Sequence, residues 1–479
     1  FLDKFVLTEI LNKFYVIKQS EPVLLVMRPY QIYAVKMAYD RVKSCHLSGF
    51  VHHTTGSGKT LTSFKLATLF RDDLQIEKVF FLIDRKDLDD QTVDEYNSFE
   101  LGCVDNTPST KRLVDDIEDS TKTMIITTIQ KMATALHKEK YAKVMNKLKD
   151  SRCIFIIDEC HRSNFGKMHG DIERHFKNAD FIGFTGTPIY EENRGAAKKT
   201  TADVFKAGTL DSCIHKYMIK EAIADGNVLS FSVEYLRATE IGKQYKSEVD
   251  YCKQNNIEIS TYYHEPKRME GIAKDIINNL ERHTHPEGKD TYTAIFAVDR
   301  VDTLLKYYDL LKKHNTKGYK IAAICHCQNN EEREEGTDET SLEKFKICIK
   351  EYNDIFDTRY EIATFDSYRK DIMKRMKQKE LPQIDLLLVV DMMLTGFDSK
   401  PTNLLILEFH KLLQAYSRTN RVDKVTKKFG QIVTYRDIKE AQDVALRLFS
   451  GDGNPNGFLL APYETYVENY RREAEMLRA

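Results

Sequence analysis

Short runs of apolar residues alternate with longer helical patterns along most of this chain. The apolar runs fall at residues 50–51, 79–83, 124–126, 153–157 and 181–184, and again at residues 292–298, 319–324, 384–390, 404–407 and 431–433. Continuous apolar runs rich in β-branched residues and separated by helices are typical of parallel strands that are covered on both faces. The pattern therefore predicts two doubly wound α/β domains in tandem.

A polar stretch at residues 238–266 and a helical pattern at 267–280 separate the two sets of strands. We expect this division of the chain: 1–22, a linker or helix from a preceding domain; 23–235, the first α/β domain; 236–290, a connecting region; 291–440, the second α/β domain; and 441–479, the start of a C-terminal helical region. The charged segment 328–341 is predicted to be a solvated loop. Because the chain starts at Phe1, without an initiator Met or a signal peptide, we expect it to be cut from a longer protein.

Composition narrows the possible classes of protein. Of the 479 residues, 42% are hydrophobic and 30% are charged, which excludes a chain that is disordered throughout. No uncharged apolar run is long enough to cross a membrane, so a cytoplasmic protein is expected. The net charge of −1, from 72 basic and 73 acidic residues, argues against a general basic coat but allows a local basic groove.

The nine cysteines are scattered and include no C-x-x-C pair, which favours reduced thiols in a cytosolic protein. Cys160 adjoins His161, and Cys325 and Cys327 flank His326. Neither group is joined by a second pair at zinc spacing, so a metal site there is the minor alternative.

A glycine-rich segment follows the first predicted strand and leads into the helical pattern 61–70. Strand, glycine loop and helix in this order are the setting of a phosphate-binding loop, whose backbone N–H groups curl around a phosphate. Lys59 would place its charge between the β- and γ-phosphates, and the Thr60 hydroxyl would ligate Mg²⁺. The usual small residue at the opening position is His53 here. The candidate nucleotide contacts are Thr55, Gly56, Ser57, Gly58, Lys59 and Thr60.

A second buried strand delivers Asp158 and Glu159 at its carboxyl end, where ligands bind in open α/β sheets. Asp158 is predicted to hold Mg²⁺, and Glu159 to position and activate the attacking water. Together with the phosphate loop, this pair predicts hydrolysis of a nucleoside triphosphate.

Three further segments favour a motor over a kinase or a switch GTPase. Thr185-Gly186-Thr187-Pro188 closes a strand with two hydroxyls, which are expected to hydrogen-bond near the acidic pair. Thr395-Gly396-Phe397-Asp398 follows a strand of the second domain. Arg418 and Arg421 are three residues apart on a predicted helix and would therefore share one face. Two guanidinium groups on one face are suited to contact a triphosphate.

In their order, these segments resemble those of superfamily 2 helicases. More closely, the chain resembles the motor region of the restriction (R) subunit of type I restriction endonucleases. The sequence motifs of this family are matched at residues 28–31, 79–88, 127–131, 158–163, 394–398 and 414–421. The resemblance extends from about Phe1 to Tyr466 and implies two RecA-like domains of the P-loop NTPase class.

The resemblance also implies roles for single residues around a nucleotide. Gln31 would read the adenine edge, which makes ATP the expected nucleotide. Asp398 would lie near the ribose, and Arg418 and Arg421 would lie near the γ-phosphate.

Arg85, Thr127 and Thr128 match motifs that line the DNA track in related motors. Hydroxyl and N–H groups suit tracking of a sugar-phosphate chain without reading its sequence. Ordinary strand-end polarity is the alternative interpretation of these three residues.

Two features depart from the family's pattern. We find no cluster of Asp, Glu and Lys that would mark the family's nuclease domain ahead of the motor. The connection between Glu408 and His410 is shorter than in the family, which indicates a deletion or a missing segment just before Arg418.

The leading hypothesis is an ATP-dependent double-stranded DNA translocase, the motor part of a type I R subunit, with ATP and Mg²⁺ in the cleft between the two domains. As given, the chain is expected to move DNA without cutting it, and the intact enzyme would need methylation (M) and specificity (S) subunits. The alternatives are another superfamily 2 motor acting on RNA or DNA, and an ATP-binding scaffold without turnover.

Overall fold

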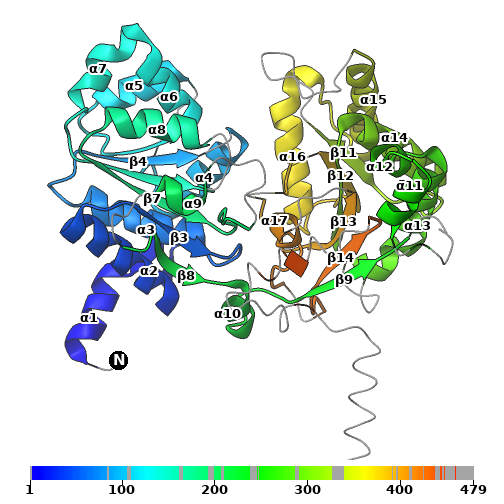
Figure 1. Ribbon diagram of the computed structural model, residues 1–479, viewed down its shortest axis with the longest axis horizontal. Coiled ribbons are helices and arrows are strands. Elements are labelled where there is room, and N and C mark those ends of the chain that lie inside the picture. The colour runs from blue at the N-terminus through cyan, green and yellow to red at the C-terminus, as the bar shows by residue number, and fades with distance from the viewer. Residues whose placement is uncertain are drawn as a thin grey trace, which may run out of the picture. The chain divides into compact units, whose positions relative to one another are not determined.

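The chain forms two compact units, Phe1–Glu221 and Ala222–Ala479, each built around a six-stranded sheet of its own (Figure 1). The computed structural model describes residues 3–83, 86–104, 109–160, 165–192, 199–205, 210–237, 245, 247–285, 291–325, 339–390, 392–394, 397–408, 413–423, 426–436, 443–444, 447 and 459.

The sheet of the first unit has the strand order β5-β4-β6-β7-β3-β8, and every neighbouring pair is parallel. The carboxyl ends of all its strands therefore lie at one edge, and β7 is the only strand between β3 and β6. The strands are β3 (Gly49–His53), β4 (Lys78–Ile83), β5 (Met124–Thr128), β6 (Cys153–Asp158), β7 (Ala179–Thr185) and β8 (Cys213–Tyr217).

Two hydrophobic cores cover the two faces of this sheet, because successive residues of a strand point to opposite sides. In β4, Phe81 joins the core formed with α2, α3 and α4, whereas Phe80 joins the core formed with α5, α6, α7 and α8. The helices are α2 (Pro29–Asp40), α3 (Lys59–Arg71), α4 (Lys86–Phe99), α5 (Thr110–Glu118), α6 (Ile129–His137), α7 (Ala142–Lys147) and α8 (Phe165–His175).

Smaller elements complete the first unit. The chain enters through α1 (Lys4–Lys13) and an antiparallel hairpin of β1 (Tyr15–Lys18) and β2 (Val23–Val26). Two short helices follow later in the chain, α9 (Thr201–Val204) and α10 (Ile219–Ala224), and the boundary between the units falls within α10.

The second unit repeats the same architecture, with the parallel strand order β11-β12-β10-β13-β14-β9. Its strands are β9 (Phe231–Tyr235), β10 (Thr293–Val298), β11 (Ile321–Ile324), β12 (Leu386–Val390), β13 (Thr402–Glu408) and β14 (Gly430–Thr434). Its helices are α11 (Glu248–Gln254), α12 (Ile259–Tyr263), α13 (Pro266–Thr284), α14 (Val301–His314), α15 (Glu339–Phe356), α16 (Phe365–Lys377) and α17 (Leu413–Tyr416).

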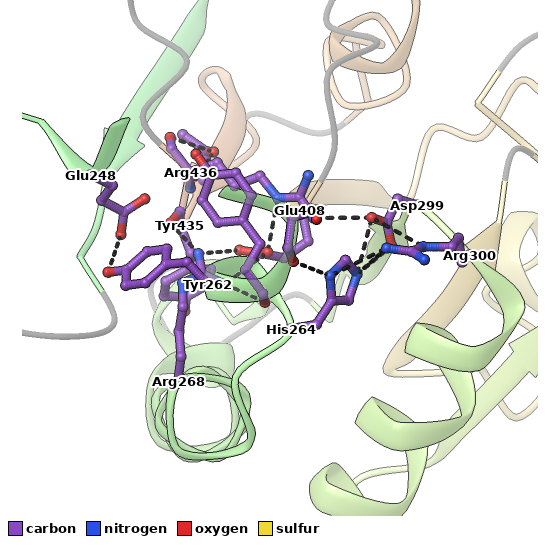
Figure 2. Close-up of polar contacts among 12 residues, drawn as sticks. Glu248, Tyr262, His264, Arg268, Asp299, Arg300, Glu408, Tyr435 and Arg436 are labelled. Atoms are coloured by element: carbon purple, nitrogen blue, oxygen red, sulfur yellow. Dashed lines mark hydrogen bonds and ion pairs between the residues drawn. The ribbon is translucent and has the colours of Figure 1, made fainter. Parts of the chain in front are cut away.

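A chain of charged side chains, all buried except the partly exposed Asp299, joins the carboxyl ends of three neighbouring strands in the second unit (Figure 2). Glu408 ends β13, Asp299 follows β10, and Arg436 lies just beyond β14. Arg268 of α13 makes two 3.1 Å contacts with the Glu408 carboxylate and donates to the Tyr435 carbonyl at 2.6 Å. Arg436 bridges Glu408 at 3.1 Å and Asp299 at 3.3 Å. This ionic network fastens α13 to the edge of the sheet.

The predicted fold class is confirmed, since every strand expected from the apolar runs is present in a parallel sheet. The sequence did not predict β8 or β9. Because β9 pairs with β14, residues 231–235 lie in the second sheet, although the first domain was expected to extend to residue 235. The helix expected at 267–280 is the longer α13.

The predictions for segments 441–479 and 328–341 concern residues that lie largely outside the described part of the chain. Of the segment 441–479, only residues 443–444, 447 and 459 are described, and of 328–341 only 339–341. In the described part of the chain, no helix is both long and apolar enough to cross a membrane.

Candidate nucleotide site

The phosphate loop leaves β3 and ends at Lys59, the first residue of α3. Gly56 (φ 92°) and Gly58 (φ 74°) adopt left-handed backbone conformations that favour glycine. The Ser57 hydroxyl donates to the Thr54 carbonyl at 2.7 Å, which closes the loop on itself. Lys59 Nζ lies 3.5 Å from the His53 carbonyl oxygen, so its ammonium group is held across the loop.

His53, at the opening position of the loop, is fully buried among aromatic rings. Its Nε2 is 2.8 Å from Nδ1 of His215 on β8, and its ring meets those of Tyr30 and Tyr217 edge-on. Burial holds the pKa of His53 well below its ordinary value, so the ring is neutral at physiological pH. The side chain packs toward β8, which explains how the loop accommodates a residue larger than the usual one.

Asp158 and Glu159 follow one another at the end of β6. The Glu159 N–H donates to Asp158 Oδ1 at 3.0 Å, and Glu159 itself is left-handed (φ 46°), which turns the chain sharply after Asp158. Burial and the charge of Glu159 raise the pKa of Asp158 to about 7, while Lys59 acts in the opposite sense. The turn is tied to β7, because the Cys160 N–H donates to the Phe184 carbonyl at 3.2 Å.

The segment after β7 lies against the phosphate loop. A Cβ at Gly186 would be 3.1 Å from Thr55 Oγ1 and 3.3 Å from the Thr55 nitrogen, so a glycine permits this approach. Thr185 Oγ1 accepts from the Thr187 N–H at 3.0 Å and closes the turn. The predicted hydrogen bonding of these hydroxyls near the acidic pair stays a prediction.

Gln31 is buried beside the phosphate loop, with only 4% of its surface exposed. Its amide nitrogen donates to the carbonyls of Ser57 (3.1 Å) and Gly58 (3.3 Å), and its amide oxygen accepts from the Arg28 N–H at 2.9 Å. An amide oxygen has two lone pairs, so one remains for a ligand. Its role toward adenine stays a prediction, and its contact with the loop was not predicted.

Thr127 and Thr128 end β5 at the far side of the sheet from β3, and both are buried. The Thr128 hydroxyl accepts from the Lys131 N–H at 3.3 Å and caps α6. Arg85 lies outside the described residues. The DNA contacts predicted for these three residues remain predictions.

The prediction that one helix carries both Arg418 and Arg421 is wrong. Helix α17 ends at Tyr416, and Arg418 lies in the following turn, where its N–H donates to the Ala415 carbonyl at 3.0 Å. Arg421 is extended and forms an antiparallel bridge with Val228. The chain changes direction here because pairing with the segment before β9 replaces the helical hydrogen bonds.

Both arginines nevertheless hold the same loop, the end of the segment 394–398. The Arg418 guanidinium donates to the Phe397 carbonyl and to Ser417 Oγ, and only 3% of the residue is exposed. Arg421 Nε lies 2.8 Å from Asp398 Oδ1, with 16% and 53% of these two side chains exposed. Arg421 and Asp398 are therefore the members of this group that a ligand can reach.

The donor set around Asp158 fits Mg²⁺. In the described part of the chain, no group of three or more His, Cys, Asp or Glu side chains could hold a metal on its own. Mg²⁺ is usually bound through one or two carboxylates together with substrate phosphates. Asp158, a carboxylate with a raised pKa, and the Thr60 hydroxyl in the first turn of α3 are suitable oxygen ligands.

Two known families match consecutive parts of the chain. The SWI2/SNF2 ATPase family matches residues 30–265, and domain 3 of the type I restriction enzyme subunit R matches residues 290–437.

Curated relatives are similar over almost the whole chain. The endonuclease subunit of a type I restriction enzyme from Staphylococcus aureus (strain COL) is 41% identical over 483 residues, which is 98% of this chain and 51% of that protein. Such a subunit from Staphylococcus saprophyticus is 42% identical over 475 residues, 97% of this chain and 50% of that protein. The chain thus spans about half the length of these relatives. The C-terminal part of such a subunit from Mycoplasma pneumoniae is 40% identical over 188 residues, 37% of this chain and 90% of that protein.

Solved structures share the fold. A fragment of an HsdR subunit from Vibrio vulnificus YJ016 has a TM-score of 0.58 at 18% identity, over 90% of this chain and 67% of that one. Yeast Dbp5, bound to RNA and ADP BeF3, has a TM-score of 0.51 at 11% identity, over 95% of this chain and 94% of that one. This likeness shows the fold, in which each unit is a RecA-like α/β domain. With relatives of this kind along its whole length, the chain belongs to the family of type I restriction enzyme endonuclease (R) subunits.

Proposed function

We propose that the chain is the ATP-dependent motor that moves double-stranded DNA in a type I restriction-modification system. One observation carries the ATP-hydrolysing part of the proposal: at the carboxyl edge of the first sheet, the loop after β3 and the pair Asp158–Glu159 at the end of β6 flank a single strand, β7. A glycine loop at a helix N-terminus beside two carboxylates is suited to hold and hydrolyse a triphosphate.

Each residue of this edge has a distinct task in the proposed reaction. Lys59 neutralises charge on the β- and γ-phosphates, and Thr60 and Asp158 hold Mg²⁺. The bound Mg²⁺ would supply charge neutralisation at the phosphate oxygens. Glu159 orients the attacking water and accepts its proton.

The second unit contributes the positive charge that the transition state needs. Arg421 leaves its ion pair with Asp398 and approaches the γ-phosphate, supported by the buried Arg418. Guanidinium groups suit this task because they remain charged and bind phosphate oxygens in a fixed geometry. Asp398 then accepts from the ribose, and the free lone pair of the Gln31 amide oxygen accepts from the adenine amino group.

Cycles of nucleotide binding and release would alternate the grip of the two units on DNA. Arg85, Thr127 and Thr128 are the proposed contacts to the sugar-phosphate chain. The curated relatives are about twice as long as this chain, which supports a nuclease domain outside it that cuts the DNA. M and S subunits are the proposed partners and would provide site recognition.

Steady-state ATP hydrolysis tests the proposal. Turnover by the chain and by its Glu159→Gln variant is measured without polynucleotide and with duplex DNA, single-stranded DNA or RNA. We expect stimulation mainly by duplex DNA and its loss in Glu159→Gln, which retains ATP binding. Displacement of a third strand from a DNA triplex, dependent on ATP, would report movement along the duplex.

The other outcomes have definite meanings. Stimulation mainly by RNA would replace the proposal with an RNA-directed superfamily 2 motor. ATP binding without turnover in the presence of every polynucleotide would favour a scaffold.

A further inference from the structure

One carbonyl of the phosphate loop receives two side-chain donors from helix α2. The Tyr30 hydroxyl donates to the Ser57 carbonyl oxygen at 2.7 Å, and Gln31 Nε2 donates to the same oxygen at 3.1 Å. A carbonyl oxygen has two lone pairs, so these donors occupy both. The Ser57 carbonyl is thereby directed toward the first turn of α2.

The Tyr30 ring is fixed in place by its neighbours. It stacks on Tyr217 of β8, with ring centroids 3.6 Å apart and an interplanar angle of 4°, and it meets His53 edge-on at 5.6 Å. Pro29 starts the helix, and the side chain of Gln31 bonds back to the Arg28 N–H, so the backbone that carries Tyr30 is itself capped. The hydroxyl therefore reaches Ser57 from a rigid position.

This contact decides where the next backbone donor points. A peptide unit is planar and trans, so the C=O of Ser57 and the N–H of Gly58 point in opposite directions. Drawing the carbonyl toward α2 turns the Gly58 N–H away from α2, and Gly58 is left-handed and exposed. Donors presented in this way at the start of a helix are those that bind phosphate.

We propose that Tyr30 is a positioning residue, which fixes the phosphate loop so that the Gly58 N–H is presented to a nucleoside di- or triphosphate. The inference rests on the proposed use of ATP and deepens it. Tyr30 acts through Ser57 and does not itself touch the nucleotide.

A positioning role of this kind has a specific kinetic signature. The Gly58 N–H is assigned to a phosphate that stays bound both before and during γ-phosphoryl transfer, and a contact of equal strength in the ground and transition states is uniform binding. Losing such uniform binding raises KM and leaves kcat unchanged. One lost neutral hydrogen bond corresponds to a change in affinity of about 2- to 12-fold.

The test compares Tyr30→Phe with Tyr33→Phe in the full chain. Both variants lose a single hydroxyl from α2, but Tyr33 is 62% exposed. We expect Tyr30→Phe to weaken Mg·ADP binding by about 2- to 12-fold in titration calorimetry and to raise KM for ATP equally, with kcat unchanged. Tyr33→Phe should match the wild type.

Three results separate the claims. If the wild-type chain binds no nucleotide, the proposed function itself fails. If the wild type binds and Tyr30→Phe binds equally well, or loses kcat at unchanged affinity, Tyr30 has no positioning role. A double-mutant cycle with Gln31→Ala adds an independent check, because donors to one oxygen should couple and additive effects would contradict the shared carbonyl.

Discussion

Asp299 shows how the ionic network acts at the level of one side chain. Burial alone would raise its pKa, but the hydrogen bond from His264 and the charge of Arg436 outweigh burial and hold the pKa well below its ordinary value of 3.8. The carboxylate therefore stays ionised in the folded protein at a pH where the unfolded chain binds a proton. Its stabilising contribution is complete above the ordinary pKa and is lost as the pH falls toward the lowered one.

We expect Asp299→Asn to lower the free energy of unfolding by about 1–3 kcal/mol near pH 7, since a charge-assisted hydrogen bond is lost. Urea unfolding of both proteins should give the same difference near pH 5 and a smaller one near pH 3. Asp309→Asn, at an exposed position of α14, is the matched control and should change stability by less than about 0.5 kcal/mol. A difference that stays constant down to pH 3 would contradict the assigned pKa direction.

At the scale of elements, the start of β14 and the turn after α17 are packed without spare room. A Cβ at Gly430 would lie 2.9 Å from the Thr419 carbonyl carbon and 3.1 Å from the Asn420 nitrogen. Backbone atoms cannot rotate away as a side chain can, so the turn that carries Arg418 would have to shift. We expect Gly430→Ala to destabilise the second unit by about 1–3 kcal/mol and to lower ATP turnover.

Thermal unfolding and ATP hydrolysis of Gly430→Ala check this expectation. Gly170→Ala is the control: it lies in helix α8, its Cβ would meet nothing within 4 Å, and alanine should favour the helix. If Gly430→Ala has the stability and turnover of the wild type, the prediction is wrong, and the turn after α17 shifts at little cost in free energy.

All the central strands could be predicted from the sequence, together with the edge strands β5 and β11, whereas the edge strands β8 and β9 could not. β12 is buried at every position and reads as an unbroken apolar run, Leu386–Val390. β8 and β9 lie at the edges of their sheets, mix polar with apolar residues, and are only partly buried. A strand with one neighbour has no need of a continuous apolar run, so β8 and β9 lack the pattern that marked the others.

The same limit applies to the candidate site. Residues whose positions follow from the neighbouring sequence could be predicted. Lys59 begins a helix after a glycine loop, and Asp158 ends a buried strand. The extended conformation of Arg421 depends on its bridge to Val228, far away in the sequence, so spacing alone indicated a helix over residues 418–421, whereas α17 ends at Tyr416. The contact of Tyr30 with Ser57 likewise depends on tertiary packing.

At the scale of the whole molecule, the proposed catalytic groups are divided between two units with separate cores. Lys59, Asp158 and Glu159 belong to the first unit, and Arg418 and Arg421 belong to the second. Neither unit holds the full set, so turnover should depend on bringing both to one nucleotide.

Mixing two inactive variants tests whether one chain supplies both halves. Glu159→Gln removes the water-activating group and Arg421→Lys removes the guanidinium, which should each lower turnover by about 100-fold. If both halves of a site come from the same chain, every chain in the mixture carries one defect, and the mixture should be as inactive as its components. If Arg421 serves the nucleotide of another chain, some sites will combine an intact Glu159 with an intact Arg421, and activity will reappear in proportion to the concentration of the partner.

We expect no recovery of activity, because the two halves are joined by one continuous chain and stay at high effective concentration. Recovery upon mixing would place the complete site between two copies of the chain.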